Sequence, residues 1–69
     1  MDIGQAVKAL KNGLKINQNQ FGHRKYYKYI YMNNEGRLVK VANNGKEKFW
    51  EPFDTELLRT DFYIVEENE

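Results

Sequence analysis

Residues able to do covalent chemistry are few in this chain. Cysteine and serine are both absent and His23 is the only histidine, so disulfides, thiolate metal sites and a Ser-His-Asp arrangement are excluded. Asp54, Glu56 and Asp61 lie close in sequence, but helix capping and solvation explain these carboxylates without catalysis. All five glycines stand singly, so no glycine-rich phosphate loop is present. The composition therefore makes an enzyme a poor interpretation, and we expect no catalytic residue, no metal and no cofactor.

Aromatic and basic side chains are better candidates, for binding rather than catalysis. Residues 24–31 interleave arginine and lysine with tyrosine, a pattern that suits base stacking and phosphate contacts but is also typical of a solvent-facing strand. Trp50 lies at a strand end and is either a partly buried core residue or a platform for a purine. Phe21 lies in a loop rich in Asn and Gln, where it either closes the core or reaches a ligand or a neighbouring subunit. Both alternatives stay open for each residue at this point.

The charge distribution bounds the kind of partner. Residues 1–48 hold ten of the 11 basic side chains and three acids, whereas residues 49–69 hold one base and seven acids. The two parts therefore carry +7 and −6 within a total of +1. Such a split is typical either of a nucleic-acid face with an acidic tail or of surfaces that attract each other, within one chain or between copies. The near-zero total favours complementary surfaces, disfavours a nucleic-acid partner and leaves a small anionic ligand open.

Size and composition predict a single cytoplasmic domain over residues 1–69. No run of about 18 apolar residues is present, so we expect no membrane partner. The opening residues lack a charged-then-apolar leader, and the absence of cysteine favours a reducing compartment. A chain of 69 residues has a small core, and its ten aromatic side chains exceed what that core covers. Size therefore argues for association, and we expect some of these aromatic side chains to lie in a subunit interface or in a binding site.

The elements that position these residues begin with an amphipathic helix. Asp2 and Gln5 match the capping-box pattern of a helix start, and Gly13 supplies a left-handed stop. Apolar residues recur at helical spacing, at Ile3, Ala6, Val7, Leu10 and Leu14. A helix this short is marginal alone, so its apolar stripe is expected to pack on a sheet.

The remainder of the chain has the alternation and the turn residues of antiparallel strands. Strands are predicted over residues 14–16, 25–32, 37–42, 46–50 and 61–66. A polar loop over 17–20 and turns over 33–36 and 43–45 connect them. A helical turn capped by Asp54 is predicted over 54–58, and a frayed acidic tail over 66–69. Alternation places Lys25, Tyr27, Tyr29 and Tyr31 on one face of their strand. The predicted fold class is α+β, an N-terminal helix packed on a small antiparallel β-sheet made of a meander plus a C-terminal strand.

Two ends of the chain resemble a known family. Residues 3–16, IGQAVKALKNGLKI, are similar to the "FGEALEALKxGKKV" start of small phage and prophage proteins, formerly a domain of unknown function and later typed as Thoeris anti-defence proteins. Residues 50–65, WEPFDTELLRTDFYIV, resemble that family's closing "W-x-P-x-x-x-D-L-L-A-x-D-W-x-V". Phe21 stands where the family has the Trp of an "R-x-x-W" landmark, Gln18 stands where Arg is usual, and Phe62 replaces the Trp of the "D-W" pair. The middle of the chain is shorter than in typical members.

The resemblance implies a non-catalytic sponge. Such proteins are homo-oligomers, often tetramers, that capture cyclic ADP-ribose derivatives or cyclic oligonucleotides without cleaving them, and so counter anti-phage defence in the bacterial host cytoplasm. By position, Phe21 and Trp50 are the implied stacking pair and Asp61 an acceptor for a base or ribose. Arg24 and Lys25 are our own candidates for phosphate contacts.

Two other function classes compete with the sponge. A small nucleic-acid- or host-protein-binding phage module would use the Tyr- and Lys-rich strand as its surface. A small phage inhibitor would instead dock on one host protein, with residues 49–69 imitating the charge of nucleic acid.

Overall fold

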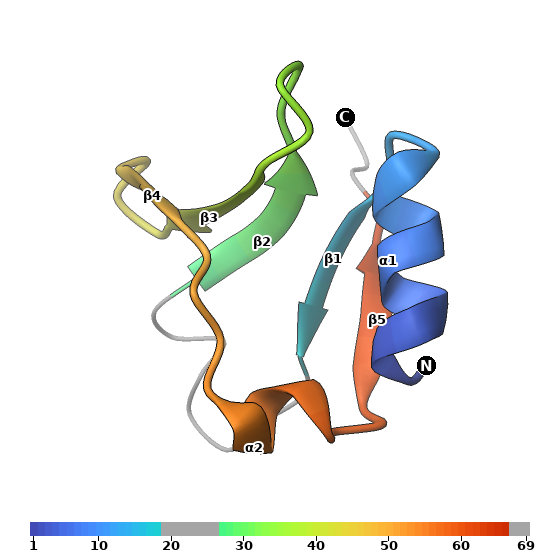
Figure 1. Cartoon of the computed structure of the whole chain (residues 1–69). Coiled ribbons are helices and arrows are strands. Elements are labelled where there is room, and N and C mark those ends of the chain that lie inside the picture. The colour runs from blue at the N-terminus through green and yellow to red at the C-terminus, as the bar shows by residue number, and fades with distance from the viewer. Residues whose placement is uncertain (19–26, 67–69) are drawn as a thin grey trace.

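In the described part of the protein, an N-terminal helix packs on a bent, five-stranded antiparallel sheet. A computed structural model describes residues 1–18 and 27–66. The elements are α1 Ile3–Lys11, β1 Lys15–Gln18, β2 Tyr27–Met32, β3 Leu38–Ala42, β4 Glu47–Phe49, α2 Asp54–Leu57 and β5 Phe62–Val65 (Figure 1). The strand order is β4-β3-β2-β1-β5, and every pairing is antiparallel. The predicted α+β fold, with a meander and a C-terminal strand, is confirmed. Within the described ranges, no helix has both the length and the apolar character needed to cross a membrane.

Helix α1 begins at the predicted capping box. The Gln5 amide donates to Asp2 Oδ1 at 2.9 Å, and the Asp2 amide donates to Gln5 Oε1 at 3.0 Å. The helix ends at Asn12, and Gly13 then takes the left-handed conformation at a φ of 84°. The expectation that Leu14 belongs to the apolar stripe is wrong: Leu14 is 42% exposed, because the chain leaves the helix before reaching it.

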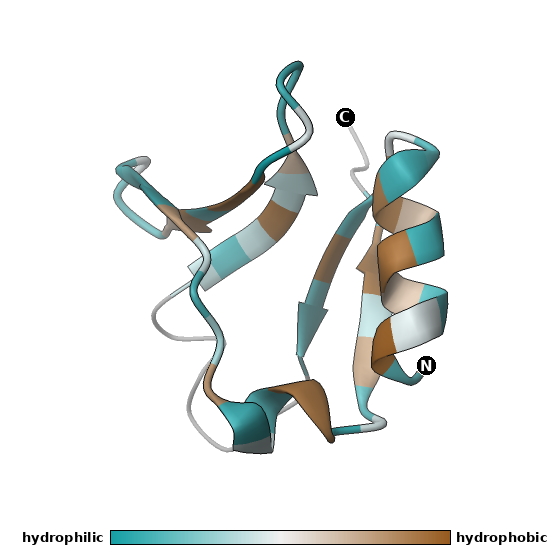
Figure 2. Cartoon of the chain, in the orientation of Figure 1, coloured by the Kyte–Doolittle hydropathy of each residue, from teal (hydrophilic) through white to brown (hydrophobic). Residues whose placement is uncertain are grey.

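The core lies between α1 and the sheet. Its buried apolar side chains come from α1, from β1, β2 and β5, and from the segment after β4: Ala6, Ala9, Leu10, Ile16, Ile30, Trp50 and Phe62. Figure 2 shows the corresponding alternation of apolar and polar residues along the helix and the strands that face it. Burial of this stripe on three strands supplies the stabilisation that a nine-residue helix lacks on its own.

Two further local expectations are wrong. Asn17 and Gln18 belong to β1 and not to a polar loop, and they are 4% and 5% exposed, because β5 pairs alongside them. Helix α2 is present as predicted, but its N-cap is Phe53 instead of Asp54. The Glu56 side chain reaches back and accepts a hydrogen bond from the Phe53 amide at 2.8 Å.

Candidate functional site

A β-bulge in β2 determines which tyrosine lies on the face of the sheet that carries the core. Tyr27 pairs with Ala42 and Tyr29 with Val41, so two residues of β2 oppose one step of β3. The extra residue reverses the alternation, and the prediction that Tyr27, Tyr29 and Tyr31 share a face is wrong for Tyr27. Its hydroxyl accepts a hydrogen bond from Lys40 Nζ at 3.1 Å. Lys40 pairs with the core residue Ile30, so Tyr27 lies on the face that carries the core.

Asn17 stabilises this bulge from the neighbouring strand. Its side-chain Nδ2 donates to the carbonyls of Tyr27 and Lys28 at 3.3 and 3.2 Å. Its Oδ1 accepts from the Gln18 amide at 2.8 Å. The irregular backbone around Tyr27 is therefore paired by one buried side chain, which explains why a polar residue is found inside β1.

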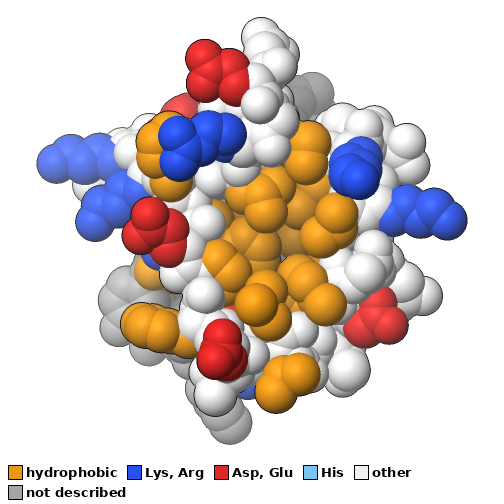
Figure 3. All heavy atoms as spheres, in the orientation of Figure 1, with side chains coloured by type: hydrophobic (Ala, Val, Ile, Leu, Met, Phe, Trp, Pro, Cys, Tyr) orange, Lys and Arg blue, Asp and Glu red, His pale blue; other side chains and the backbone are white. Residues whose placement is uncertain are grey.

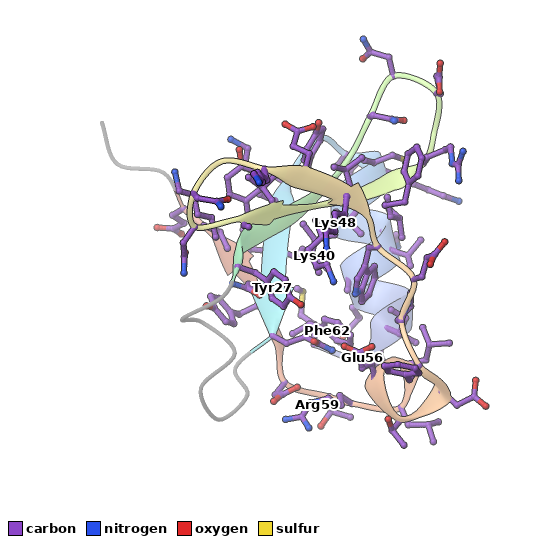
Figure 4. All side chains as sticks on the ribbon, turned by 90° about the vertical axis from the view of Figure 1, so that its left-hand side faces the viewer. Tyr27, Lys40, Lys48, Glu56, Arg59 and Phe62 are labelled. Carbon is purple, nitrogen blue, oxygen red and sulfur yellow. The ribbon has the colours of Figure 1, made fainter. Side chains whose placement is uncertain are left out.

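Tyr27 separates two adjoining cavities. The first, called here the Trp50 cavity, has a volume of about 340 Å³, and Tyr27, Lys40, Trp50, Phe53, Glu56 and Arg59 are among its lining residues. It opens between the sheet and α2, and Figure 4 shows Tyr27 and Lys40 on one side with Glu56 and Arg59 on the other. A cavity with aromatic walls and a few charged groups is the usual form of a small-molecule site.

The second cavity, called here the lysine cavity, has a volume of about 200 Å³. It is lined by Tyr27, Lys40, Ala42, Asn44, Lys46 and Lys48. Lys40 of β3 lies directly opposite Lys48 of β4. Like charges in opposite positions of a sheet destabilise it. These side chains therefore form an electropositive pocket in which an anion would relieve the repulsion.

Trp50 belongs to both the core and the Trp50 cavity. It is 7% exposed, and its ring meets the ring of Phe62 edge to face, with centroids 6.2 Å apart. The side chain is thus a buried wall of the cavity. Phe53, which lines the same cavity, is 76% exposed.

Asp61 pairs with Arg59 at the edge of the Trp50 cavity. Arg59 Nε donates to Asp61 Oδ1 at 2.9 Å, and Nη2 donates to Oδ2, so the pair is bidentate. The hydrogen bond from Arg59 lowers the pKa of Asp61, and the same bond raises the pKa of Arg59. The predicted acceptor is therefore already engaged, and Arg59 is the member of the pair that lines the cavity.

The other predicted site residues, Phe21, Arg24 and Lys25, lie outside the described residues and stay predictions. Sequence reasoning missed the lysines opposite each other and the inward turn of Tyr27. The first had a signal, because the hairpin turn over 43–45 brings Lys40 and Lys48 into register. The orientation of Tyr27 had no signal in the sequence of β2. Among residues 1–18 and 27–66, no three His, Asp or Glu side chains are grouped to hold a metal ion.

One face of the molecule is apolar at its centre. Met1, Ile3, Met32 and Leu38 are partly buried and pack against the core. Figure 3 shows hydrophobic side chains gathered in the middle of this face, with lysine, arginine, aspartate and glutamate around the rim. Leu58, which follows α2, is 80% exposed. Such an apolar surface with a charged rim is typical of a protein interface.

No protein-family model matches the chain, and no curated protein has a significantly similar sequence.

Proposed function

We propose that the protein is a non-catalytic binding protein that sequesters a small anionic nucleotide of the cyclic ADP-ribose type, as phage and prophage anti-defence sponges do. The observation that carries the proposal is the pair of adjoining cavities that share Tyr27 and Lys40. A nucleotide of this type has an aromatic base in one part and a diphosphate in another. The aromatic walls of one cavity are complementary to the base, and the lysines of the other are complementary to the diphosphate.

The lysine cavity is the proposed phosphate site. Lys40, Lys46 and Lys48 line it, and none of the described residues that line it is acidic. Each ammonium group can donate charge-assisted hydrogen bonds to phosphate oxygens. Bound phosphate would also reduce the repulsion between Lys40 and Lys48, so binding energy would include relief of a strain built into the hairpin.

The Trp50 cavity is the proposed site of the base and ribose. Tyr27 and Phe53 offer ring surfaces for stacking, while Glu56 and Arg59 offer an acceptor and donors for base edges or hydroxyls. Lys40 Nζ lies 4.4 Å from the centroid of the Tyr27 ring, so one face of this ring already has a cation–π partner. Sequestration requires affinity alone, and these groups supply it without a nucleophile.

A homo-oligomer, a dimer or a tetramer, is part of the proposal. The apolar face of Figure 3 and the exposed Leu58 are the surfaces that a second copy of the chain would cover. The opposite charges of residues 1–48 and 49–69 support contact between copies, because a basic surface on one would meet an acidic surface on the next. We place this assembly in the cytoplasm of a bacterial host.

The test is recovery of intact ligand. Purified protein is incubated with cyclic ADP-ribose isomers and ADP-ribose, washed, and heated to release what it holds. The expected result is a rise in Tm on incubation and recovery of unmodified nucleotide. Absence of both across the panel would remove the proposal, and recovery of a cleaved product would indicate an enzyme.

The face of the sheet opposite the core supports a second candidate function, that of a nucleic-acid-binding module. The bulge leaves Tyr29 and Tyr31 on that face, where Lys15 Nζ lies 4.5 Å from the centroid of the Tyr29 ring. Aromatic rings with nearby cations on an open sheet can stack unpaired bases. Binding to a single-stranded oligonucleotide that weakens with salt and with Tyr29→Ala would favour this function.

A further inference from the structure

The two edges of the sheet differ in how the described residues cover them. Along β5, the Met1 amino group donates to the Phe62 carbonyl at 2.9 Å, and the Phe62 amide donates to the Met1 carbonyl at 3.2 Å. Strand β4 pairs with β3 on one side, no described strand lies on its other side, and all of Glu47–Phe49 is exposed. The open edge of a sheet is a template on which another chain can pair.

The backbone of β4 directs hydrogen-bonding groups to this open edge. The Lys46 carbonyl and the Trp50 amide, which flank the strand, bond to β3 and its end at 2.8 and 2.9 Å. Alternate residues of an edge strand direct their amide and carbonyl to opposite sides. Glu47 and Phe49 therefore direct an amide and a carbonyl each away from β3. Two such residues, separated by one, are what an added antiparallel strand needs for its main-chain hydrogen bonds.

A cavity borders β4 on each face of the sheet. The lysine cavity lies on the face that carries the core, because Lys48 pairs with Lys40 and Lys40 with Ile30. The second, called here the Phe49 cavity, has a volume of about 340 Å³ and is lined by Tyr31, Asn33, Val39, Glu47, Lys48 and Phe49. It lies on the opposite face, where Tyr31, Val39 and Phe49 are neighbours across three strands. Side chains of a strand added beside β4 would alternate between these two faces.

The chemistry of each face defines the side chain that fits there. Lys40 and Lys48 lie side by side in Figure 4, and the lysine cavity they line suits a carboxylate. On the other face, the half-exposed Phe49 ring offers an apolar contact. Glu47, held by a hydrogen bond from the Tyr31 hydroxyl at 3.0 Å, offers a negative charge to a cation. The fitting segment is extended, with acidic side chains alternating with an apolar and a basic one.

A second copy of β4 does not fit this edge. In antiparallel self-pairing, opposite residues lie on the same face, so a register centred on β4 places Lys48 opposite Lys48 or Glu47 opposite Glu47. Like charges in opposite positions destabilise a sheet. The charges of β4 therefore disfavour its own copy and favour a different chain.

We propose that the open edge of β4 is a docking site for an extended, acidic segment of another protein, which adds to the five-stranded sheet as a further strand. The backbone groups of Glu47 and Phe49 hold the segment, and the lysine and Phe49 cavities select its alternating side chains. This site goes beyond the proposed function and does not rest on it, because its ligand is a protein segment and not a nucleotide.

The first test is calorimetry with the peptide TVEKE, acetylated and amidated at its ends. Antiparallel to β4, its valine lies opposite Phe49, its first glutamate opposite Lys48 and its lysine opposite Glu47. N-methylation of the valine removes a donor to the edge and should weaken binding at least about tenfold. N-methylation of the first glutamate is the matched control, because that amide points away from β4, and it should change the affinity less than about twofold. Equal binding of the two methylated peptides, or no binding of TVEKE, would overturn the proposal.

The second test measures recognition of charge. The peptide TVQKE, in which glutamine replaces the first glutamate, should bind the wild type about fivefold to tenfold more weakly than TVEKE. Lys48→Met should weaken TVEKE binding to a similar extent and leave TVQKE binding nearly unchanged. Lys8→Met, at an exposed lysine of α1, should change neither affinity. Equal binding of TVEKE and TVQKE by the wild type would refute recognition by the lysine cavity.

Amide hydrogen exchange locates the bound peptide. TVEKE should slow exchange at the amides of Glu47 and Phe49, which face the open edge, and leave exchange at Lys48, which faces β3, unchanged. Slowing confined to other strands would refute docking at this edge. A protein that holds cyclic ADP-ribose but not TVEKE would refute the docking site alone, whereas one that binds TVEKE but not the nucleotide would refute the proposed function alone.

Discussion

Replacing Asn17 by alanine removes the side chain that pairs the backbone of the β2 bulge. Two carbonyls, those of Tyr27 and Lys28, would lose their donor, and the Gln18 amide would lose its acceptor. Asn17 is 4% exposed and its bond with the Gln18 amide is buried, whereas its bonds to the two carbonyls are half-buried. The structure therefore predicts a large effect for a substitution that removes few atoms.

The size of the effect follows from those three bonds. The loss of each of these hydrogen bonds costs about 1 kcal/mol, and less where the group is half-buried, so Asn17→Ala should lower the free energy of unfolding by about 2–3 kcal/mol. A domain of this length has a total of about 3–10 kcal/mol, which makes the loss a large share of the whole. The corresponding decrease in Tm is about 10–20 °C.

Urea denaturation followed by fluorescence measures this change directly, because Trp50 is the only tryptophan and is buried. Asn12→Ala is the matched control. Asn12 is exposed, and its backbone amide, which the substitution keeps, makes its cap contacts. It should change the free energy of unfolding by less than about 0.5 kcal/mol. A similarly small loss for Asn17→Ala, at an unchanged m-value, would refute the reasoning that this side chain stabilises the bulge.

Three further predictions concern charge and assembly. Lys40→Met should weaken pyrophosphate binding about tenfold in calorimetry, because it removes an ammonium donor from the lysine cavity; an unchanged affinity would contradict this. Since the Arg59 hydrogen bond lowers the pKa of folded Asp61, the pair stabilises the protein above the ordinary carboxylate pKa, and this contribution is lost as pH falls through the folded value. Asp61→Asn should therefore reduce the dependence of Tm on pH between about 5 and 2, and an unchanged dependence would exclude the pair as its source. Leu58→Glu should shift the mass measured by light scattering toward the monomer, whereas an assembly of unchanged mass would place the interface elsewhere.

Local signals predict most of the fold. The Asp2–Gln5 capping box, Gly13 and the turn over 43–45 act through neighbouring residues, so helix α1 and the β3–β4 hairpin can be located from the sequence. The burial of Asn17 and Gln18 cannot, because it depends on β5, which is more than 40 residues away along the chain. The bulge likewise depends on a side chain from another strand. A strict alternation of faces along a strand cannot include an inserted residue. It therefore places Tyr27 on the wrong face.

The candidate site, too, can be predicted from the sequence only in part. Trp50 is a candidate from the sequence and does line a cavity, since a tryptophan after a strand end is informative by itself. Arg59 has no such signal, and its neighbour Asp61 matches a family landmark instead, whereas the structure pairs the two and leaves Arg59 at the cavity. The lysine cavity needs the register of β3 and β4, which converts three separate cations into one pocket.

The most direct test of the account is calorimetric titration of the purified wild-type protein and of the double variant Lys40→Met, Lys48→Met with cyclic ADP-ribose. The account predicts that the wild type binds and that heating returns the nucleotide unchanged. It also predicts that the double variant stays folded, with a cooperative thermal transition, but binds at least about 100-fold more weakly, because it lacks two ammonium groups that would donate to the phosphates. Equal affinity in the two proteins, or no heat of binding in the wild type, would contradict the claim that these cavities sequester an anionic nucleotide.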